Sequence, residues 1–228
     1  MASEYDLTPG ISWPTILYRC KWREHNSEAP GIIEHLYQIR ARYTQNIASE
    51  VARSAKSSYG LFESPFDLLE TDHAGLKKLR AFIEEALQLA VSHVNGAQVP
   101  PERIQPIIVD SWFHITNDGG YHDAHFHAHC SWCGIYYLQA GDSTAVPDQG
   151  AGNGVNRFYS PLTFAGAFSD YGNHYLSSNR IDIVPEDGVL ILFPAYLLHS
   201  ALPYRGRKDR IVISFNSQSV LRESDGVA

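Results

Sequence analysis

The sequence predicts a mostly β protein with flanking helices (α+β), in which a double-stranded β-helix (jelly roll) follows an N-terminal helical segment. Two observations support this fold class. Apolar residues recur at helical spacing through the first hundred residues. From Ile104 onward the pattern becomes that of extended chain, in short runs rich in β-branched and aromatic residues, separated by Gly, Asp, Asn and Pro. Several short strands without helices between them are typical of an antiparallel sandwich or barrel.

Two helices are expected before residue 100. The apolar face of the first consists of Ile32, Ile33, Leu36, Ile39, Tyr43 and Ile47. The preceding "HNSEAPG" offers capping residues and a proline start. Thr71 or Asp72 can cap the second helix, which should end at "VNGAQVPP", residues 94–101, because Gly and Pro interrupt helices. The apolar face of the second helix consists of Leu76, Leu79, Phe82, Ile83, Leu87 and Ala90.

The jelly roll is expected over residues 101–228, with the helical lead of residues 1–100 packed on the outside of one sheet. Together they would form a single domain, residues 1–228. The expected strands are "PIIVDSWFHIT", "WCGIYYLQA", "NRFYS", "HYLSSNRIDIVP", "GVLILFP" and "RIVISFNSQSV". Residues 141–174 are long and Gly-rich. We expect part of this segment to form a loop over the mouth of a site, where such loops commonly determine specificity.

Composition excludes several classes of protein. Hydrophobic residues make up 44% of the chain and charged residues 19%, so a substantial core is expected. A net charge of -7 argues against a nucleic-acid binder, and no apolar stretch approaches the length of a membrane span. The start, "MASEYDLTPG", has no secretory pattern, and three cysteines do not make a disulfide framework. We therefore expect a cytoplasmic protein; no oligomeric state follows from the sequence.

Histidine is concentrated in "YHDAHFHAHCSW", residues 121–132. In a strand, residues two apart share a face, so His125, His127 and His129 would point together if extended, and His122 would point away. We interpret His129 as a second-sphere or loop residue. Imidazole is a ligand for Fe, Cu, Ni and Zn alike. A further ligand is expected from His199, which follows an apolar strand at the rim of the sheet. The sequence therefore predicts a metal site.

Arg210 opens the strand that follows His199 and is flanked by apolar residues. A planar guanidinium matches a carboxylate with two hydrogen bonds, so Arg210 near a metal would favour a dicarboxylate ligand. The alternative is a structural ion pair with Asp209 or Glu186.

A zinc site that combines Cys130 and Cys133 with His127 and His129 is a competing interpretation. Structural zinc sites usually pair one Cys-x-x-Cys with a second ligand pair some distance away. On one strand, two residues three apart would also point to opposite faces. We therefore expect the two cysteines to be small buried residues.

Three segments carry a resemblance to a known family. "HFHAHCSWCGIYYLQAG" resembles the H-x-H…(S/C)-G-x-Y-Y-(V/L) segment of an uncharacterised branch of the Fe(II)/2-oxoglutarate oxygenases. "GVLILFPAYLLHSALPYRGRKDRIVISFN" resembles their G-x-L-x-x-F-P-x-x-x-x-H…R-x-x-(I/V)-S-x-N segment, and "SSYGLFESPFDLL" is also similar. The "IYYL" strand and the spacing of Arg210 from His199 resemble prolyl-hydroxylase-type members of this superfamily.

The resemblance implies an oxygenase that uses Fe(II), O2 and 2-oxoglutarate as co-substrate and releases succinate and CO2. It would hydroxylate, or otherwise oxidise, an unactivated C–H bond of a small molecule or a peptide side chain. By position, His125 and His199 match the two metal histidines, and Arg210 matches the arginine that binds the distal carboxylate of 2-oxoglutarate. Tyr137 and Ser214 match side chains that often help to bind it.

His127 departs from the usual pattern, because most of the superfamily has an aspartate there. The usual ferrous site has two histidines and one carboxylate. With His127 the three ligands would all be neutral; Asp123 is an alternative carboxylate, although its order in the motif would be reversed. Two other functions remain open. "GVLILFPAYLLH" also resembles the second cupin motif, as in metal dioxygenases that need no distal-carboxylate arginine, and a non-catalytic jelly-roll binding module is the third candidate.

Overall fold

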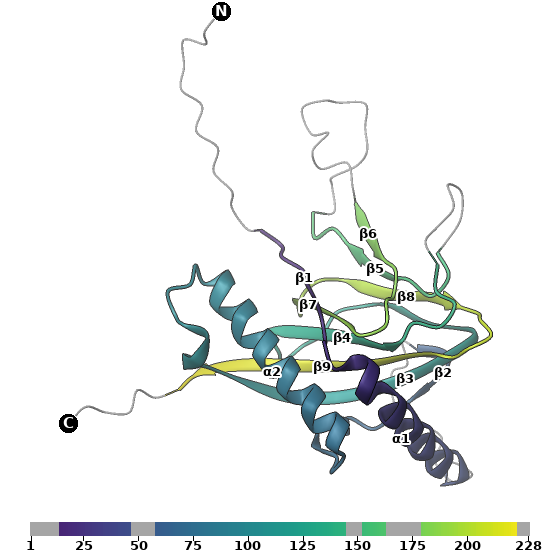
Figure 1. The fold of residues 1–228 in the computed structure, drawn as a ribbon. Coiled ribbons are helices and arrows are strands. Elements are labelled where there is room, and N and C mark those ends of the chain that lie inside the picture. The colour runs from purple at the N-terminus through teal and green to yellow at the C-terminus, as the bar shows by residue number, and fades with distance from the viewer. Residues whose placement is uncertain (1–13, 47–57, 145–151, 163–178, 223–228) are drawn as a thin grey trace, which may run out of the picture.

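The structure is a computed structural model that describes residues 14–46, 58–144, 152–162 and 179–222. It confirms the predicted fold class, a mostly β jelly roll with two helices (Figure 1). The helices are α1 (His25–Asn46) and α2 (Ala74–Val94). The strands are β1 (Tyr18–Lys21), β2 (Ser58–Glu63), β3 (Ile104–His125), β4 (Trp132–Gln139), β5 (Asn156–Tyr159), β6 (Arg180–Ile183), β7 (Val189–Pro194), β8 (His199–Tyr204) and β9 (Arg210–Leu221). Short 3-10 turns lie at Leu68–Glu70 and Pro101–Arg103.

Strand β3 joins the two sheets of the jelly roll. The strand order is β1-β7-β4-β9-β3-β8-β5-β6, with β2 paired to β3. Residues 104–116 of β3 pair with β9, whereas residues 120–125 pair with β8. One long strand therefore runs from the sheet that the helices cover into the sheet that carries β5, β6 and β8 (Figure 1).

The central strands are buried on both faces, and this explains their continuous apolar sequences. Their outward side chains pack with both helices in one core cluster, which includes Tyr136, Leu190, Leu192, Ile213 and Phe215. The alternate side chains form a second cluster between the sheets, which includes Cys133, Ile135, Tyr137, Ile191 and Val212. Because side chains alternate along a strand, the positions in step with Val212 on β9 face the interior of the jelly roll.

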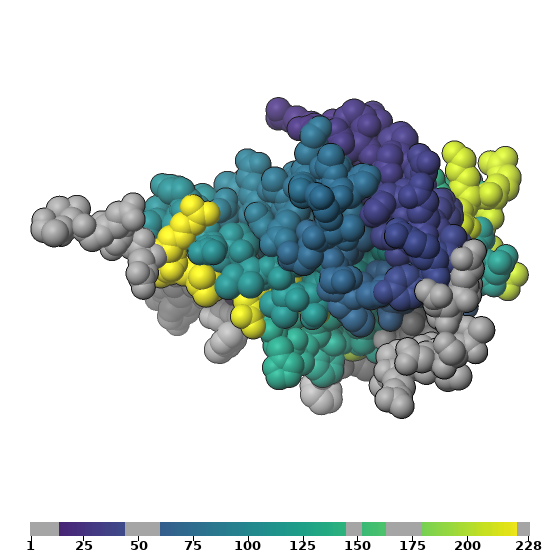
Figure 2. All heavy atoms as spheres, turned by 90° about the horizontal axis from the view of Figure 1, so that it is seen from below, coloured from purple at the N-terminus to yellow at the C-terminus, as the bar shows by residue number. Residues whose placement is uncertain are grey.

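The helices cover the outer face of the first sheet (Figure 2). Both begin at residues that differ from the expected caps. Helix α1 begins at His25, so "HNSEAPG" forms its first turns and Pro30 lies inside it. The N-cap of α2 is His73, whose Nδ1 accepts a hydrogen bond from the Leu76 N–H at 3.3 Å. The predicted end of α2 is confirmed, because the helix ends at Val94 and Asn95 caps it.

Three strands were not expected, and two of them lie within the first hundred residues, which are therefore not wholly helical. Strand β1 adds to the edge of β7, β2 pairs with β3, and β8 follows β7. Each is four to six residues long. Gly60 with its positive φ interrupts β2, and Pro203 interrupts β8, so neither shows a clear alternation. Of "HYLSSNRIDIVP", β6 covers Arg180–Ile183, and residues 174–178 lie outside the described residues.

No helix in the described parts of the chain combines the length and the apolar character needed to cross a bilayer.

Candidate metal centre

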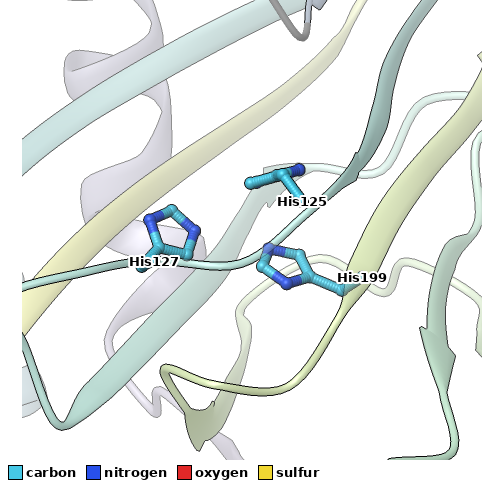
Figure 3. Close-up of side chains that lie close together, drawn as sticks. All are labelled: His125, His127 and His199. Carbon is cyan, nitrogen blue, oxygen red and sulfur yellow. The ribbon is translucent and has the colours of Figure 1, made fainter.

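Three histidines converge at the junction of β3 and β8. His125 ends β3, His199 begins β8, and the two residues are direct partners in the pairing of these strands. His127 follows two residues later, and its backbone N–H donates to the Ala195 carbonyl at 3.0 Å. One ring nitrogen from each histidine lies within 4.8 Å of the other two (Figure 3). The structure therefore brings together the three side chains that the sequence singled out.

Backbone carbonyls determine the tautomers of two of these rings. Nδ1 of His125 lies 2.7 Å from the Asp123 carbonyl, and Nδ1 of His199 lies 2.9 Å from the Leu197 carbonyl. A carbonyl only accepts, so each Nδ1 carries the proton and each Nε2 keeps a lone pair for a metal. Asp123 thus contributes its backbone, while its exposed side chain is outside the group of convergent ligand atoms.

Burial keeps the three imidazoles uncharged. It lowers the pKa of His125, and it lowers the pKa of His127 to about 4, with a further contribution from the neighbouring His125. It lowers the pKa of His199 well below the ordinary value. His199 is 3% exposed and its ring packs against Phe193 and Phe158, with centroids 4.6 and 5.7 Å away. Neutral imidazole is the form that binds metal, so the site is ready for an ion near pH 7.

The orientation expected for His122 is wrong. The His122 ring lies 4.1 Å from the His125 ring, although these residues should point to opposite faces of a regular strand. The pairing of β3 with β8 shifts register on both sides of His122, and these irregularities break the alternation. His129 lies in the turn after β3, exposed and with a positive φ, outside the three-histidine group.

The two cysteines also differ from the expectation. Their Sγ atoms lie 3.7 Å apart, on the same side, because Cys130 precedes β4 in a turn and so does not alternate with Cys133. Cys133 is buried as expected, and its Sγ donates to Oδ1 of Asn216. Cys130 is only partly buried. Neither cysteine belongs to the groups of convergent metal-ligating atoms found among the described residues.

Arg210 lies on the interior face of β9 and is 2% exposed. Its Nη2 donates to Oδ1 of Asn156, and the Tyr137 hydroxyl donates to the same oxygen at 3.0 Å. The guanidinium carbon lies 5.8 Å from the centre of the Tyr137 ring. Nε of Arg210 is buried and has no hydrogen-bond partner among the described residues. A buried donor without an acceptor is costly, so this atom indicates a missing anionic ligand.

The structural alternatives for Arg210 are not observed. Glu186 pairs with Arg19 and Lys21 on the surface, and Asp209 lies 3.6 Å from Arg40. Burial without a counter-ion lowers the pKa of Arg210. The shared acceptor Asn156 was not predicted; its only sequence signal is an amide at the start of the apolar-flanked strand "NRFY".

One small pocket contains both the histidines and Arg210. Its lining includes His125, His127, His199, Arg210 and Ser214, and its volume is about 40 Å³. That space holds an ion and a water or two, so lining side chains must move to admit 2-oxoglutarate. Tyr137 stands behind Asn156 and is not part of the lining. A larger cavity of about 860 Å³ lies between β1 and α2 but contains none of these groups, so we place the chemistry in the small pocket.

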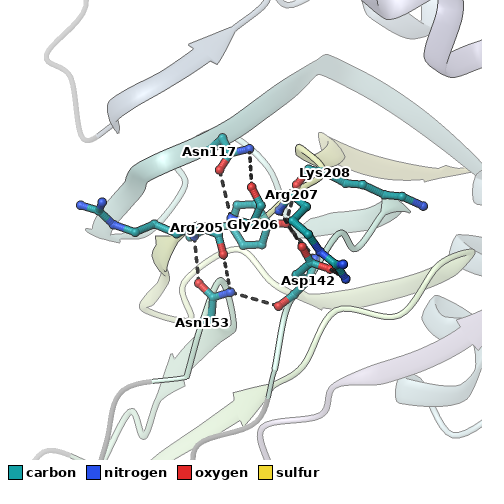
Figure 4. A network of polar contacts seen from close by, with 8 residues as sticks. Asn117, Asp142, Asn153, Arg205, Gly206, Arg207 and Lys208 are labelled. Atoms are coloured by element: carbon teal, nitrogen blue, oxygen red, sulfur yellow. Dashed lines mark hydrogen bonds and ion pairs between the residues drawn. The ribbon is translucent and has the colours of Figure 1, made fainter.

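Hydrogen bonds from other segments hold the backbone of the turn before Arg210, although the side chains of this turn are basic. Asn117 bonds the backbone of Gly206 at 3.1 and 3.2 Å, and Asn153 bonds the backbone of Arg205 at 2.9 and 2.8 Å (Figure 4). Asp142 accepts from the Arg207 N–H at 2.6 Å. The backbone that leads into Arg210 is therefore held by three separate segments, while the side chain of Arg207 is 94% exposed.

One protein-family model matches part of the chain. Residues 110–216 match a family model described as "Putative 2OG-Fe(II) oxygenase". The matched segment spans just under half of the chain. It contains all three histidines, Arg210 and Ser214. The family match and the three-histidine group indicate an enzyme of the 2-oxoglutarate- and Fe(II)-dependent class, as the sequence motifs predicted.

Solved structures share the fold at low sequence identity. The epimerase SnoN from nogalamycin biosynthesis, described as non-heme and alpha-ketoglutarate-dependent, is 14% identical with a TM-score of 0.54, over 92% of this chain and 80% of SnoN. HygX from Streptomyces hygroscopicus, solved with nickel and 2-oxoglutarate bound, is 11% identical with a TM-score of 0.54, over 90% and 83%. A Pseudomonas putida prolyl-4-hydroxylase is 13% identical with a TM-score of 0.50, over 89% and 92%. No curated protein sequence matches the chain.

Proposed function

We propose that this oxygenase holds Fe(II) through His125, His127 and His199 and binds the distal carboxylate of 2-oxoglutarate through Arg210. The reaction would hydroxylate, or otherwise oxidise, an unactivated C–H bond of a small molecule or a peptide side chain. The observation that carries the proposal is the buried Arg210, with its unsatisfied Nε, in the same pocket as three convergent imidazole nitrogens. The helices and the jelly roll would act as one domain over residues 1–228.

Three protein ligands leave positions on the metal for the co-substrate and oxygen. Fe(II), 2-oxoglutarate and O2 supply the oxidising chemistry, in which 2-oxoglutarate becomes succinate and CO2. The chain's contribution is geometry. Hydrogen bonds to the carbonyls of Asp123 and Leu197 hold two of the rings in the metal-binding tautomer, and the phenylalanines around His199 keep water from its buried side.

Arg210 fixes the other end of the co-substrate. Its Nη2 is held by Asn156, which leaves Nε as the donor that seeks an acceptor. Ser214 is two strand positions before Asn216 and four after Arg210, on the interior face of β9, and its hydroxyl lines the same pocket. Tyr137 would act one step removed, by donating to Asn156 and so keeping that amide oriented toward Arg210.

Arg210 also separates this function from the cupin-type alternative. A cupin dioxygenase has no requirement for a buried cation that faces the metal pocket. A non-catalytic binding module is less well supported, because the family model that matches residues 110–216 describes oxygenases.

Two exposed aromatic side chains are close in sequence to the pocket histidines. Phe126, between His125 and His127, is 65% exposed, and Tyr196, near His199, is 57% exposed. Large exposed aromatic side chains often belong to binding surfaces, and these two would suit a substrate with an apolar surface. We propose that both side chains contact the substrate and that neither holds the iron.

Succinate formation tests this function. The protein is loaded with Fe(II) without oxygen, supplied with 2-oxoglutarate and air, and succinate is measured with and without candidate substrates. Wild type should form succinate, faster with a true substrate, and His199→Ala should not. Succinate output from His199→Ala equal to that of wild type would remove the three-histidine site from the reaction.

A further inference from the structure

A second group of metal-ligating side chains lies beside the three histidines. It consists of Glu63 on β2 and of His114 and His122 on β3, and one ligand atom from each lies within 4.8 Å of the other two. Nε2 of His114 is 2.8 Å from Oε2 of Glu63. The His114 and His122 ring centres are 5.5 Å apart. Two imidazoles and one carboxylate are the composition of a common divalent-metal site.

The fold brings these residues together from three places in the sequence. Glu63 is the direct pairing partner of His114 across β2 and β3. Gly60 has a positive φ and approaches Gly120 closely; a Cβ at Gly120 would lie 2.4 Å from the Gly60 carbonyl oxygen. This close approach sits at the register shift of β2. Because His122 lies between two irregularities of β3, its side chain is on the same side as His114.

The side chains of Glu63 and His114 are mostly buried, and two members of the group line the metal pocket. The side chain of His114 is 10% exposed and that of Glu63 is 25% exposed. His114 and His122 both line the small pocket that contains His125 and His199. A partly buried carboxylate and a buried imidazole are each costly without a partner, and the hydrogen bond between Glu63 and His114 supplies one. A metal ion in place of the shared proton would supply another.

We propose that Glu63, His114 and His122 form a second site for a divalent transition metal such as Zn²⁺ or Fe²⁺. Bonds from one ion to nitrogen and oxygen are about 2.0–2.2 Å long, so ligand atoms on it lie at most about 4.4 Å apart. Adjacent ligand atoms on a tetrahedral ion lie about 3.3–3.6 Å apart. The ligand atoms of Glu63, His114 and His122 lie within 4.8 Å of one another, so binding requires them to move together by up to about 1.5 Å. Mg²⁺ and Ca²⁺ are excluded as the natural occupants because they prefer oxygen ligands.

When a metal binds Nε2 of His114, the proton between this atom and the Glu63 carboxylate must leave Nε2. A neutral ring moves that proton to Nδ1 and releases none, whereas a doubly protonated ring releases one proton for each ion bound. The carboxylate matters for charge. An ion held by three neutral imidazoles keeps its full double charge, and a second dication nearby is repelled. Glu63 lowers the net charge of the second site by one, which makes occupancy of both sites compatible.

Metal stoichiometry tests the proposal. Metal-free protein is dialysed against Zn²⁺ alone, and bound zinc is counted by elemental analysis. Wild type should bind two ions per chain, and Glu63→Gln should bind one. Glutamine keeps an oxygen that accepts from His114, so the fold should be retained, and an unchanged thermal midpoint checks this. His114→Ala provides a second variant and should also lose one ion.

Two matched controls separate this site from its neighbours. His199→Ala should lose the other ion and keep the one at Glu63, so a failure of the three-histidine site appears in that variant alone. Cys130→Ser should still bind two ions. The proposal is overturned if Glu63→Gln and His114→Ala bind as many ions as wild type, or if the ion they should have lost disappears in Cys130→Ser instead. In the first case Glu63 and His114 form only a hydrogen-bonded pair.

Discussion

His127 is the residue at which this site differs from the common two-histidine, one-carboxylate arrangement. With three neutral ligands, ferrous iron keeps a charge of +2, whereas an aspartate at His127 would lower it to +1. We expect 2-oxoglutarate, a dianion, to strengthen iron binding more in wild type than in His127→Asp. Iron affinity measured with and without 2-oxoglutarate gives the coupling directly. His127→Asp should keep measurable succinate output, and His127→Ala should lose most of it. An alanine variant that equals wild type in both measurements would show that His127 is not a ligand.

Arg210 carries the second prediction. Removing the partner of a buried charge costs roughly 3–5 kcal/mol, or about two to four orders of magnitude in apparent affinity. Arg210→Ala should therefore raise the 2-oxoglutarate requirement by that factor while iron content stays nearly unchanged. Arg210→Lys should rescue poorly, because an ammonium cannot reproduce the guanidinium that spans Asn156 and the ligand. Succinate output titrated against 2-oxoglutarate is the measurement. An unchanged half-saturation point in Arg210→Ala would exclude Arg210 from co-substrate binding.

At the scale of elements, the turn between β8 and β9 decides where Arg210 lies. Asn153 makes hydrogen bonds to both backbone groups of Arg205 and to the Asp142 carbonyl. Asn153→Ala should lower the free energy of unfolding by about 1–3 kcal/mol. Because the turn also positions Arg210, the same variant should raise the 2-oxoglutarate requirement.

Arg207→Ala is the matched control for the turn. The Arg207 side chain is 94% exposed, and its ion pair with Asp142, at 3.7 Å, should contribute little to stability. Denaturant unfolding and a 2-oxoglutarate titration compare the two variants. Equal behaviour of Asn153→Ala and Arg207→Ala would mean that the network of Figure 4 does not position Arg210.

The elements that the sequence predicted are those with a clear repeat. Helix α2 shows apolar residues at helical spacing, and β4, β7 and β9 show continuous apolar runs because both of their faces are buried. Strands β1, β2 and β8 are short and carry Gly, Pro or charged residues, so their structure depends on pairing with distant neighbours.

Most of the side chains at the site could be predicted from the sequence, but some of their contacts and orientations could not. His125, His127, His199 and Arg210 lie in motifs with fixed spacing, and the structure brings them to one pocket. The contribution of Asn156 and the inward position of His122 were not predictable. The first depends on contacts between distant strands, and the second depends on irregular pairing that strict alternation does not allow.

For the whole molecule, the buried histidines make stability depend on pH. Burial lowers the pKa of His127 to about 4 and that of His122 to about 3, whereas an unfolded chain titrates near about 6.5. Below about pH 6.5 the unfolded state binds protons that the folded state does not, so the stability of the metal-free protein should fall as the pH falls. The loss continues until the pH passes below the folded-state values.

Urea unfolding of metal-free protein between about pH 7 and about pH 5 measures this dependence. His127→Gln should show a shallower loss of stability than wild type over this range, since glutamine does not titrate. Identical slopes would mean that His127 is protonated as readily in the folded chain as in the unfolded one. Because burial lowers the pKa of His127 to about 4, this ring stays neutral and able to bind metal well below pH 6.5. We therefore expect acid to release iron at about pH 4 rather than at about pH 6.5.

The central claim is that iron lies among three histidines and that 2-oxoglutarate bridges it to Arg210. A crystal structure grown without oxygen, with one equivalent of Fe(II) and an excess of 2-oxoglutarate, tests this most directly through the anomalous scattering of iron. We predict one main peak about 2.0–2.2 Å from nitrogens of His125, His127 and His199. The distal carboxylate of 2-oxoglutarate should lie within hydrogen-bond distance of Nε of Arg210. A peak at Cys130 and Cys133, or an iron peak found only at Glu63, His114 and His122, would contradict the claim.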